Sequence, residues 1–125
     1  MVDGVRRPDF EKLEVYRLAE KLANTIWDMV KAWEFFAKDT MGKQIVKSAD
    51  SVGANIAEGN GRYNSNDNQR FVKIARGSLY ETIHWLRLAS YRQLISDEQV
   101  EKIKPIIDEL SPKSNAYLNS FNKRK

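Results

Sequence analysis

Residues 66–92 of this 125-residue chain read NDNQRFVKIARGSLYETIHWLRLASYR, and their pattern indicates the fold class. Apolar residues recur there at spacings of three and four, which is the period of an amphipathic α-helix, and no alternating strand pattern competes. We expect this helix to begin after a Ser65 or Asn66 cap. The residues predicted to face the core are Phe71, Ile74, Ala75, Ser78, Leu79, Trp85, Leu86 and Ala89.

The same period appears in three more segments of the chain. We predict helices over residues 9–36, with Asp9 as N-cap, and over 40–59. A further helix is predicted over 97–121, because Ser96 and Gln99 form a capping-box pattern at its start. Small residues fill much of the 40–59 segment, which suits close approach of a neighbouring backbone.

The four predicted helices account for most of the chain. Helices joined by short connections pack antiparallel, so we expect one all-α domain over residues 1–125, an up-down-up-down four-helix bundle. Pro105 and Pro112 lie opposite the apolar face of the last helix, so that helix is expected to be bent or broken near them. The basic tail at 122–125 is expected to fray.

Two features of the first two helices suggest close contacts. Apolar residues cover about half of the circumference of the 9–36 helix, where an ordinary surface helix needs about 100°. That helix is therefore either central in the bundle or packed on another subunit. Gly53, inside the second helix, is expected where a side chain would not fit, and Gly59 is expected to act as a helix C-cap.

Composition excludes several classes of protein. The chain has no Cys, which removes disulfide scaffolds, Cys-based zinc sites, iron–sulfur clusters and thiol catalysis. It has one His and no apolar stretch long enough to span a membrane. We therefore expect no enzyme activity, no metal, no cofactor and no membrane association, and the absence of Cys permits an intracellular protein. The 21 Lys and Arg against 17 Asp and Glu give a net charge of +4.

Cations and aromatic rings alternate along one face of the 66–92 helix, at spacings of three and four, within an arc of about 80°. We call these residues the basic–aromatic stripe: Lys73, Arg76, Tyr80, His84, Arg87 and Tyr91. Cations can neutralise phosphates and rings can stack on unpaired bases, so this face is a candidate nucleic-acid surface, with Arg62 nearby in the chain. The alternative is a solvated face or a subunit contact. His84 has no nucleophile or carboxylate at a catalytic spacing.

A second set of polar residues lies along one face of the 40–59 helix. Its members are Gln44, Lys47, Ser51, Asn55 and Glu58. They are expected either to hydrogen-bond across a helix contact or to form a solvated face. The following Glu58–Arg62 segment is glycine-rich. A phosphate-binding loop follows a strand and ends in Gly-Lys-Ser/Thr, whereas this segment follows a predicted helix, so we do not expect it to bind phosphate in that way.

Several motifs resemble those of one known family. The run Gln44–Gly59 (QIVKSADSVGANIAEG), then Arg62, then Arg70–Glu81 (RFVKIARGSLYE), with Phe10–Tyr16 near the start, resembles the 23S ribosomal RNA intervening-sequence proteins. The residues that match the family's motif are Gln44, Ser51, Asn55, Glu58, Gly59, Arg62, Gly77, Ser78 and Glu81.

This resemblance implies a small antiparallel four-helix bundle that assembles as a homopentamer in the bacterial cytoplasm. It implies no enzymatic activity. Some members are encoded within intervening sequences of large-subunit ribosomal RNA genes, and a related protein is a nucleic-acid-binding accessory of diversity-generating retroelements. We therefore expect an oligomer that binds RNA or DNA without sequence preference. The alternative is a protein-interaction scaffold that makes no contact with nucleic acid.

Overall fold

The computed structural model describes residues 9–122. Its long helices are α1 (Glu14–Val30), α3 (Lys43–Asn60), α4 (Ser65–Tyr91) and α5 (Asp97–Ser120). The shorter elements are a 3₁₀ helix, η1 (Asp9–Lys12), the single turn α2 (Phe35–Ala37) and a π-helix, η2 (Lys38–Gly42). No strand occurs in the described part of the chain, so the all-α prediction is confirmed.

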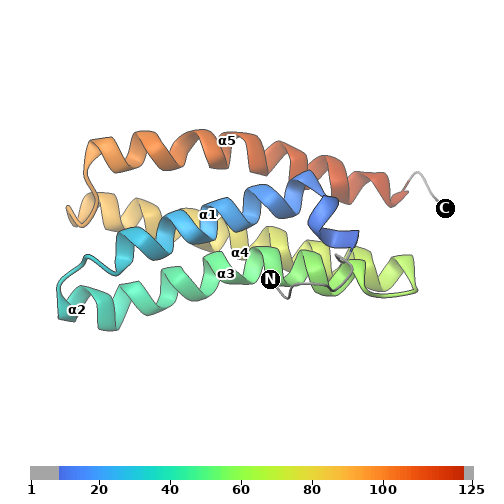
Figure 1. The fold of residues 1–125 in the computed structure, drawn as a ribbon, viewed down its shortest axis with the longest axis horizontal. Coiled ribbons are helices and arrows are strands. Elements are labelled where there is room, and N and C mark those ends of the chain that lie inside the picture. The colour runs from blue at the N-terminus through green and yellow to red at the C-terminus, as the bar shows by residue number, and fades with distance from the viewer. Residues whose placement is uncertain (1–8, 123–125) are drawn as a thin grey trace, which may run out of the picture.

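The long helices pack side by side as a four-helix bundle. Figure 1 shows each of them starting at the end of the bundle where the previous one finishes. Helix α3 contacts α1 and, more extensively, α4, while α5 contacts both α1 and α4. Each long helix therefore has two neighbours, and α4 is held mainly by α3.

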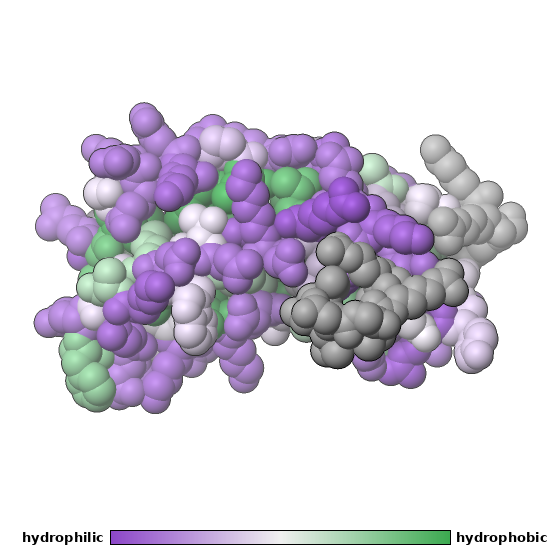
Figure 2. Space-filling view, viewed as in Figure 1, coloured by the Kyte–Doolittle hydropathy of each residue, from purple (hydrophilic) through white to green (hydrophobic). Residues whose placement is uncertain are grey.

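The core runs between the four helices and takes side chains from each of them. Its fully buried members include Leu22, Ile26, Ile45, Ile56, Leu79 and Leu110. The wide apolar arc predicted for the first helix is only partly buried within the bundle, because Trp27 remains 54% exposed. The face viewed in Figure 2 is mostly hydrophilic, with a hydrophobic patch at the end of the bundle where α2 lies. Phe35 and Phe36 of α2 are 77% and 72% exposed.

The prediction of one helix over 9–36 is wrong. Asp9 lies inside η1, α1 starts after Leu13 and ends at Val30, and helical backbone resumes only at Phe35. The chain reverses direction between these points so that α3 can lie along α1. At this reversal the backbone approaches α1 closely, since a Cβ on Gly42 would lie 2.8 Å from Val30 Cγ1.

The helix caps agree with the sequence at one helix and differ at another. The Ser96 capping box is confirmed, with Gln99 N donating to Ser96 Oγ at 3.2 Å and Ser96 N donating to Gln99 Oε1 at 2.9 Å. The cap of α4 is Asn64 and not Ser65 or Asn66, because Asn64 Oδ1 accepts from the backbone N–H of Asn66 at 2.7 Å.

The two prolines do not break the last helix. Helix α5 continues through Pro105 and Pro112, both of which are exposed. A proline leaves the carbonyl four residues earlier without its helical donor, and here those carbonyls belong to the exposed residues Glu101 and Asp108, where water can bind them. The tail beyond Asn122 lies outside the described residues.

Gly59 has a different role from the one predicted. Helix α3 continues past it to Asn60, and the C-cap is Gly61. Gly59 is buried against α4, where a Cβ would lie 2.9 Å from Phe71 Cβ and 3.0 Å from the Asn68 carbonyl oxygen. At Gly53 the prediction is wrong, because a Cβ there would only reach van der Waals contact, 3.4 Å from Tyr16 Cε1.

The core face of α4 is rotated from the predicted one. Ile74 is 44% exposed, whereas Val72 and Thr82, which were not assigned to the core, are buried. Thr82 Oγ1 lies 2.9 Å from Ser48 Oγ of α3 and 2.8 Å from the Ser78 carbonyl oxygen. These buried hydroxyls are hydrogen-bonded across the α3–α4 contact, which removes the cost of burying them.

Candidate nucleic-acid interface

The basic–aromatic stripe lies on the surface of α4, as the helical period predicts. Lys73, Tyr80, His84, Arg87 and Tyr91 are exposed, and Arg76 is half-buried. Its first and last members, Lys73 and Tyr91, are 18 positions apart, which corresponds to about 27 Å along the helix. The stripe is therefore a long, narrow surface of one subunit.

Two cations of the stripe have no acidic partner among the described residues. Neither Lys73 nor Arg87 forms an ion pair with any residue in the described range 9–122. Helix α4 itself carries four Lys and Arg but only two carboxylates, Asp67 and Glu81. Positive charge along this helix is thus in excess.

Lysines on the other helices are more often paired. The Nζ–carboxylate distances are 3.2 Å for Lys31–Asp28, 2.7 Å for Lys43–Asp39, 3.0 Å for Lys104–Asp108 and 2.9 Å for Lys113–Glu14. The hydrogen bond from Lys113 to Glu14 raises the pKa of Lys113 and joins α5 to α1. These surfaces attract an anion less strongly than the stripe does, because their charge is locally balanced.

Arg76 and Tyr80 already interact with each other. Arg76 Nη2 donates to Tyr80 Oη at 3.1 Å, and its guanidinium lies 5.1 Å from the centre of the Tyr80 ring. One surface of that ring is therefore occupied. Tyr91, at 87% exposure, has its ring free for stacking.

His84 and Trp85 form an edge-to-face pair with ring centres 4.9 Å apart. Trp85 Nε1 donates to Glu81 Oε2 at 3.1 Å, so this carboxylate is engaged beside the stripe. Of the other α4 motif residues, Ser78 is half-buried and its carbonyl accepts from Thr82, and Gly77 faces open space.

Arg62 is not part of the stripe in three dimensions. Its Nη2 donates to Glu58 Oε1 at 2.8 Å, and its guanidinium lies 4.7 Å from the centre of the Phe71 ring. Phe71 is on the side of α4 that packs toward Gly59 of α3, roughly opposite the stripe. Because Glu58 balances the charge of Arg62, Arg62 does not belong to the proposed surface.

The polar residues of α3 do not join it to another helix of this chain through any hydrogen bond in the described part. Asn55 Nδ2 donates to the Ser51 carbonyl oxygen of its own helix at 2.8 Å, and Glu58 pairs with Arg62. Gln44 and Lys47 are exposed. Within one subunit, Glu58 is exposed as well, whereas Ser51 and Asn55 are half-buried, and the cross-helix hydrogen bond comes from Ser48 instead.

An apolar groove between α4 and α5, which the sequence did not predict, borders the stripe. Its volume is about 660 Å³, and Arg87 and Tyr91 lie on its α4 side. Val100 and Ile107 of α5 are half-buried, pack against the core and line this groove. The half-buried position of these residues depends on the spacing between α4 and α5, which no local pattern encodes.

Within residues 9–122, no group of three or more His, Asp or Glu is placed to hold a metal ion. None of the helices in that range is long and apolar enough to cross a membrane.

The sequence and the fold of this chain are both similar to those of known proteins. The family model for the 23S rRNA-intervening sequence protein matches residues 11–116. The chain belongs to this family. This family member is also similar to the crystal structure of a protein of unknown function from the S23 ribosomal protein family of Bacteroides thetaiotaomicron VPI-5482. The TM-score is 0.74 at 28% sequence identity, and the match covers 83% of this chain and 97% of that chain. No curated protein matches the chain.

Proposed function

We propose that this protein is a non-enzymatic oligomer of the bacterial cytoplasm that binds RNA or DNA without sequence preference through the basic–aromatic stripe of α4. The observation that carries the proposal is the exposed charge of Lys73 and Arg87, which no carboxylate within residues 9–122 neutralises, on a helix that also presents Tyr91. Phosphate neutralisation supplies most of the affinity of non-specific binding, and ring stacking adds to it. Contacts to phosphates carry no sequence information directly, which favours binding without sequence preference.

Oligomerisation is part of the proposal because one subunit carries little charge. A net charge of +4 on one chain gives weak binding, whereas several copies held together engage one strand at several points. Exposed apolar side chains away from α4, namely Trp27, Phe35 and Phe36, support contact between subunits. A homopentamer, the assembly that the family resemblance implies, would have five times the 14.5-kDa mass in light scattering.

The test is an anisotropy titration of a labelled single-stranded RNA and the matching DNA at about 50 mM salt. The double variant Lys73→Gln/Arg87→Gln is expected to weaken binding about tenfold or more, because both unpaired cations are removed. Its matched control, Lys31→Gln/Lys43→Gln, removes the same charge from ion-paired lysines and is expected to bind within about twofold of wild type.

Three results would count against the proposal. Wild-type protein could fail to bind either strand, or both double variants could weaken binding equally, which would mean that the position of the charge does not matter. If Lys73→Gln/Arg87→Gln instead dissociates the oligomer, the stripe is a subunit contact, and the protein-interaction scaffold replaces the nucleic-acid proposal.

A further inference from the structure

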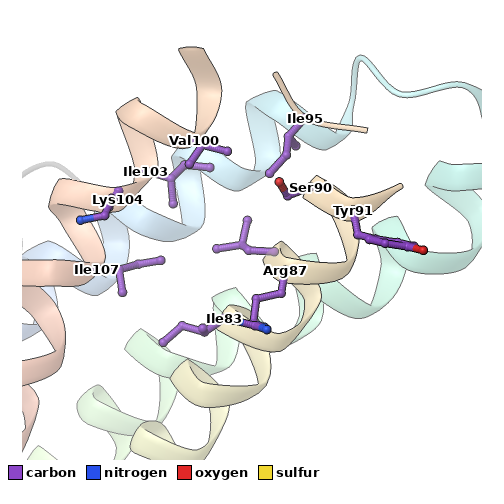
Figure 3. A pocket seen from close by; sticks show the side chains of 10 residues that line it. Ile83, Arg87, Ser90, Tyr91, Ile95, Val100, Ile103, Lys104 and Ile107 are labelled. Carbon is purple, nitrogen blue, oxygen red and sulfur yellow. The ribbon is translucent and has the colours of Figure 1, made fainter. Parts of the chain in front are cut away.

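The α4–α5 groove is an apolar surface that the bundle leaves uncovered. Its apolar lining consists of Ile83 and Leu86 from α4, Ile95 from the connection, and Val100, Ile103 and Ile107 from α5. Figure 3 shows these labelled isoleucine and valine side chains facing one another across the space between the two helices. The first and last lining residues are eight positions apart on α4, Ile83 and Tyr91, and seven apart on α5, Val100 and Ile107, so the groove extends about 12 Å along the bundle.

The groove has the size and composition of a small-molecule site. Its volume of about 660 Å³ lies within the range of ordinary ligand pockets, about 300–1,000 Å³, which are mostly apolar with a few polar groups. Half-buried Ile83, Val100 and Ile107 keep part of their apolar surface in contact with water. An apolar chain lying along the groove would remove that surface from water.

The polar groups of the groove are cationic and hydroxylic. Arg87 lines it without an acidic partner among the residues described, and Ser90 and Tyr91 line the same α4 side, although the Tyr91 ring points away from the space between the helices (Figure 3). The other cation, Lys104, is paired with Asp108 at 3.0 Å. The groove therefore offers one unneutralised guanidinium next to an apolar surface.

From this juxtaposition we propose that the α4–α5 groove binds a fatty acid, with the acyl chain on the isoleucine-lined floor and the carboxylate on Arg87. A guanidinium binds a carboxylate through two parallel N–H···O bonds, and one arginine matches one negative charge. The inference does not depend on nucleic-acid binding, although both use Arg87.

Calorimetric titration of the full chain with dodecanoate, kept below its micelle concentration, tests this assignment. Wild-type protein is expected to bind one dodecanoate per chain. Arg87→Gln is expected to weaken dodecanoate binding at least tenfold and to leave the affinity for uncharged dodecanol within twofold, since only the head group contacts the arginine. Arg70→Gln removes an equal charge elsewhere on α4 and is expected to change neither affinity.

A second variant tests the floor of the groove. Ile107→Trp fills the groove and is expected to abolish binding of both dodecanoate and dodecanol. Arg87 is exposed, so Arg87→Gln decides the question even if Ile107→Trp does not fold. The proposal is overturned if dodecanoate does not saturate the protein, if Arg87→Gln binds it as tightly as wild type, or if cross-linking places a second copy of the chain or a partner protein's helix in the groove.

Discussion

Replacing Gly59 and Gly77 by alanine is expected to change the stability of the fold in opposite directions. Both are glycines of the family motif and both lie in helices, but a Cβ at Gly77 would meet nothing within 4 Å. A Cβ at Gly59 would lie 2.7 Å from Asn68 Oδ1, 2.9 Å from Phe71 Cβ and 3.0 Å from the Asn68 carbonyl oxygen. The same substitution therefore separates helix propensity from the packing of α3 on α4.

The magnitudes follow from these contacts. Alanine at position 77 gains about 0.5–1 kcal/mol of helix propensity without a steric cost. At position 59, overpacking costs about 1–3 kcal/mol, because backbone and Cβ atoms of α4 must move, and propensity offsets only part of it. We expect a net loss of about 1–2 kcal/mol for Gly59→Ala.

Urea unfolding followed by far-UV circular dichroism, at one protein concentration, measures both changes. The corresponding shifts in Tm are roughly 3 °C per kcal/mol for a chain of this size. The packing argument is refuted if Gly59→Ala is as stable as wild type, and the assignment of Gly77 to open space is refuted if Gly77→Ala is less stable.

Two further predictions concern polar side chains, Thr82 and Asp50. Thr82→Val keeps the shape of a fully buried residue but loses the hydroxyl that lies 2.9 Å from Ser48 Oγ, so it should cost about 0.5–1.5 kcal/mol in urea unfolding. Thr25→Val, which loses only a local bond to the Lys21 carbonyl oxygen, should cost less, and equal losses would contradict the role of the α3–α4 bond. Burial raises the pKa of Asp50, so the folded state binds this proton more tightly than the unfolded chain, and the associated stability is lost as pH rises through the folded pKa. Asp50→Asn should therefore be slightly more stable than wild type at pH 7 and equal to it at acidic pH, and the difference should be small because Asp50 is exposed. A difference independent of pH would contradict this.

The helices were predictable where local signals are strong. Ser96 and Gln99 set the start of α5 through contacts within one turn, so the sequence predicts that cap correctly. The break after Val30 has no proline or glycine to mark it, since it arises where the chain turns back and Gly42 meets Val30. A contact between distant residues of this kind leaves no local pattern.

In the candidate site, the residues that share one helix face were predictable, and the contacts between helices were not. The stripe follows from helical period alone, and its residues do lie on the surface of α4. Arg62 could have been separated from it, because Glu58 precedes Arg62 by four residues, the spacing of a helical ion pair. Thr82 could not have been assigned to the core from its own helix, because its buried hydroxyl depends on Ser48 of α3.

The most direct test of the central proposal is the salt dependence of nucleic-acid binding. If Lys73 and Arg87 neutralise phosphates, the negative slope of log K against log salt concentration for single-stranded RNA should become shallower in Lys73→Gln/Arg87→Gln, by about 0.7 for each phosphate that is no longer neutralised. The Lys31→Gln/Lys43→Gln control should keep the wild-type slope. An unchanged slope in the stripe variant would show that these two cations do not bind phosphates and would contradict the proposed interface.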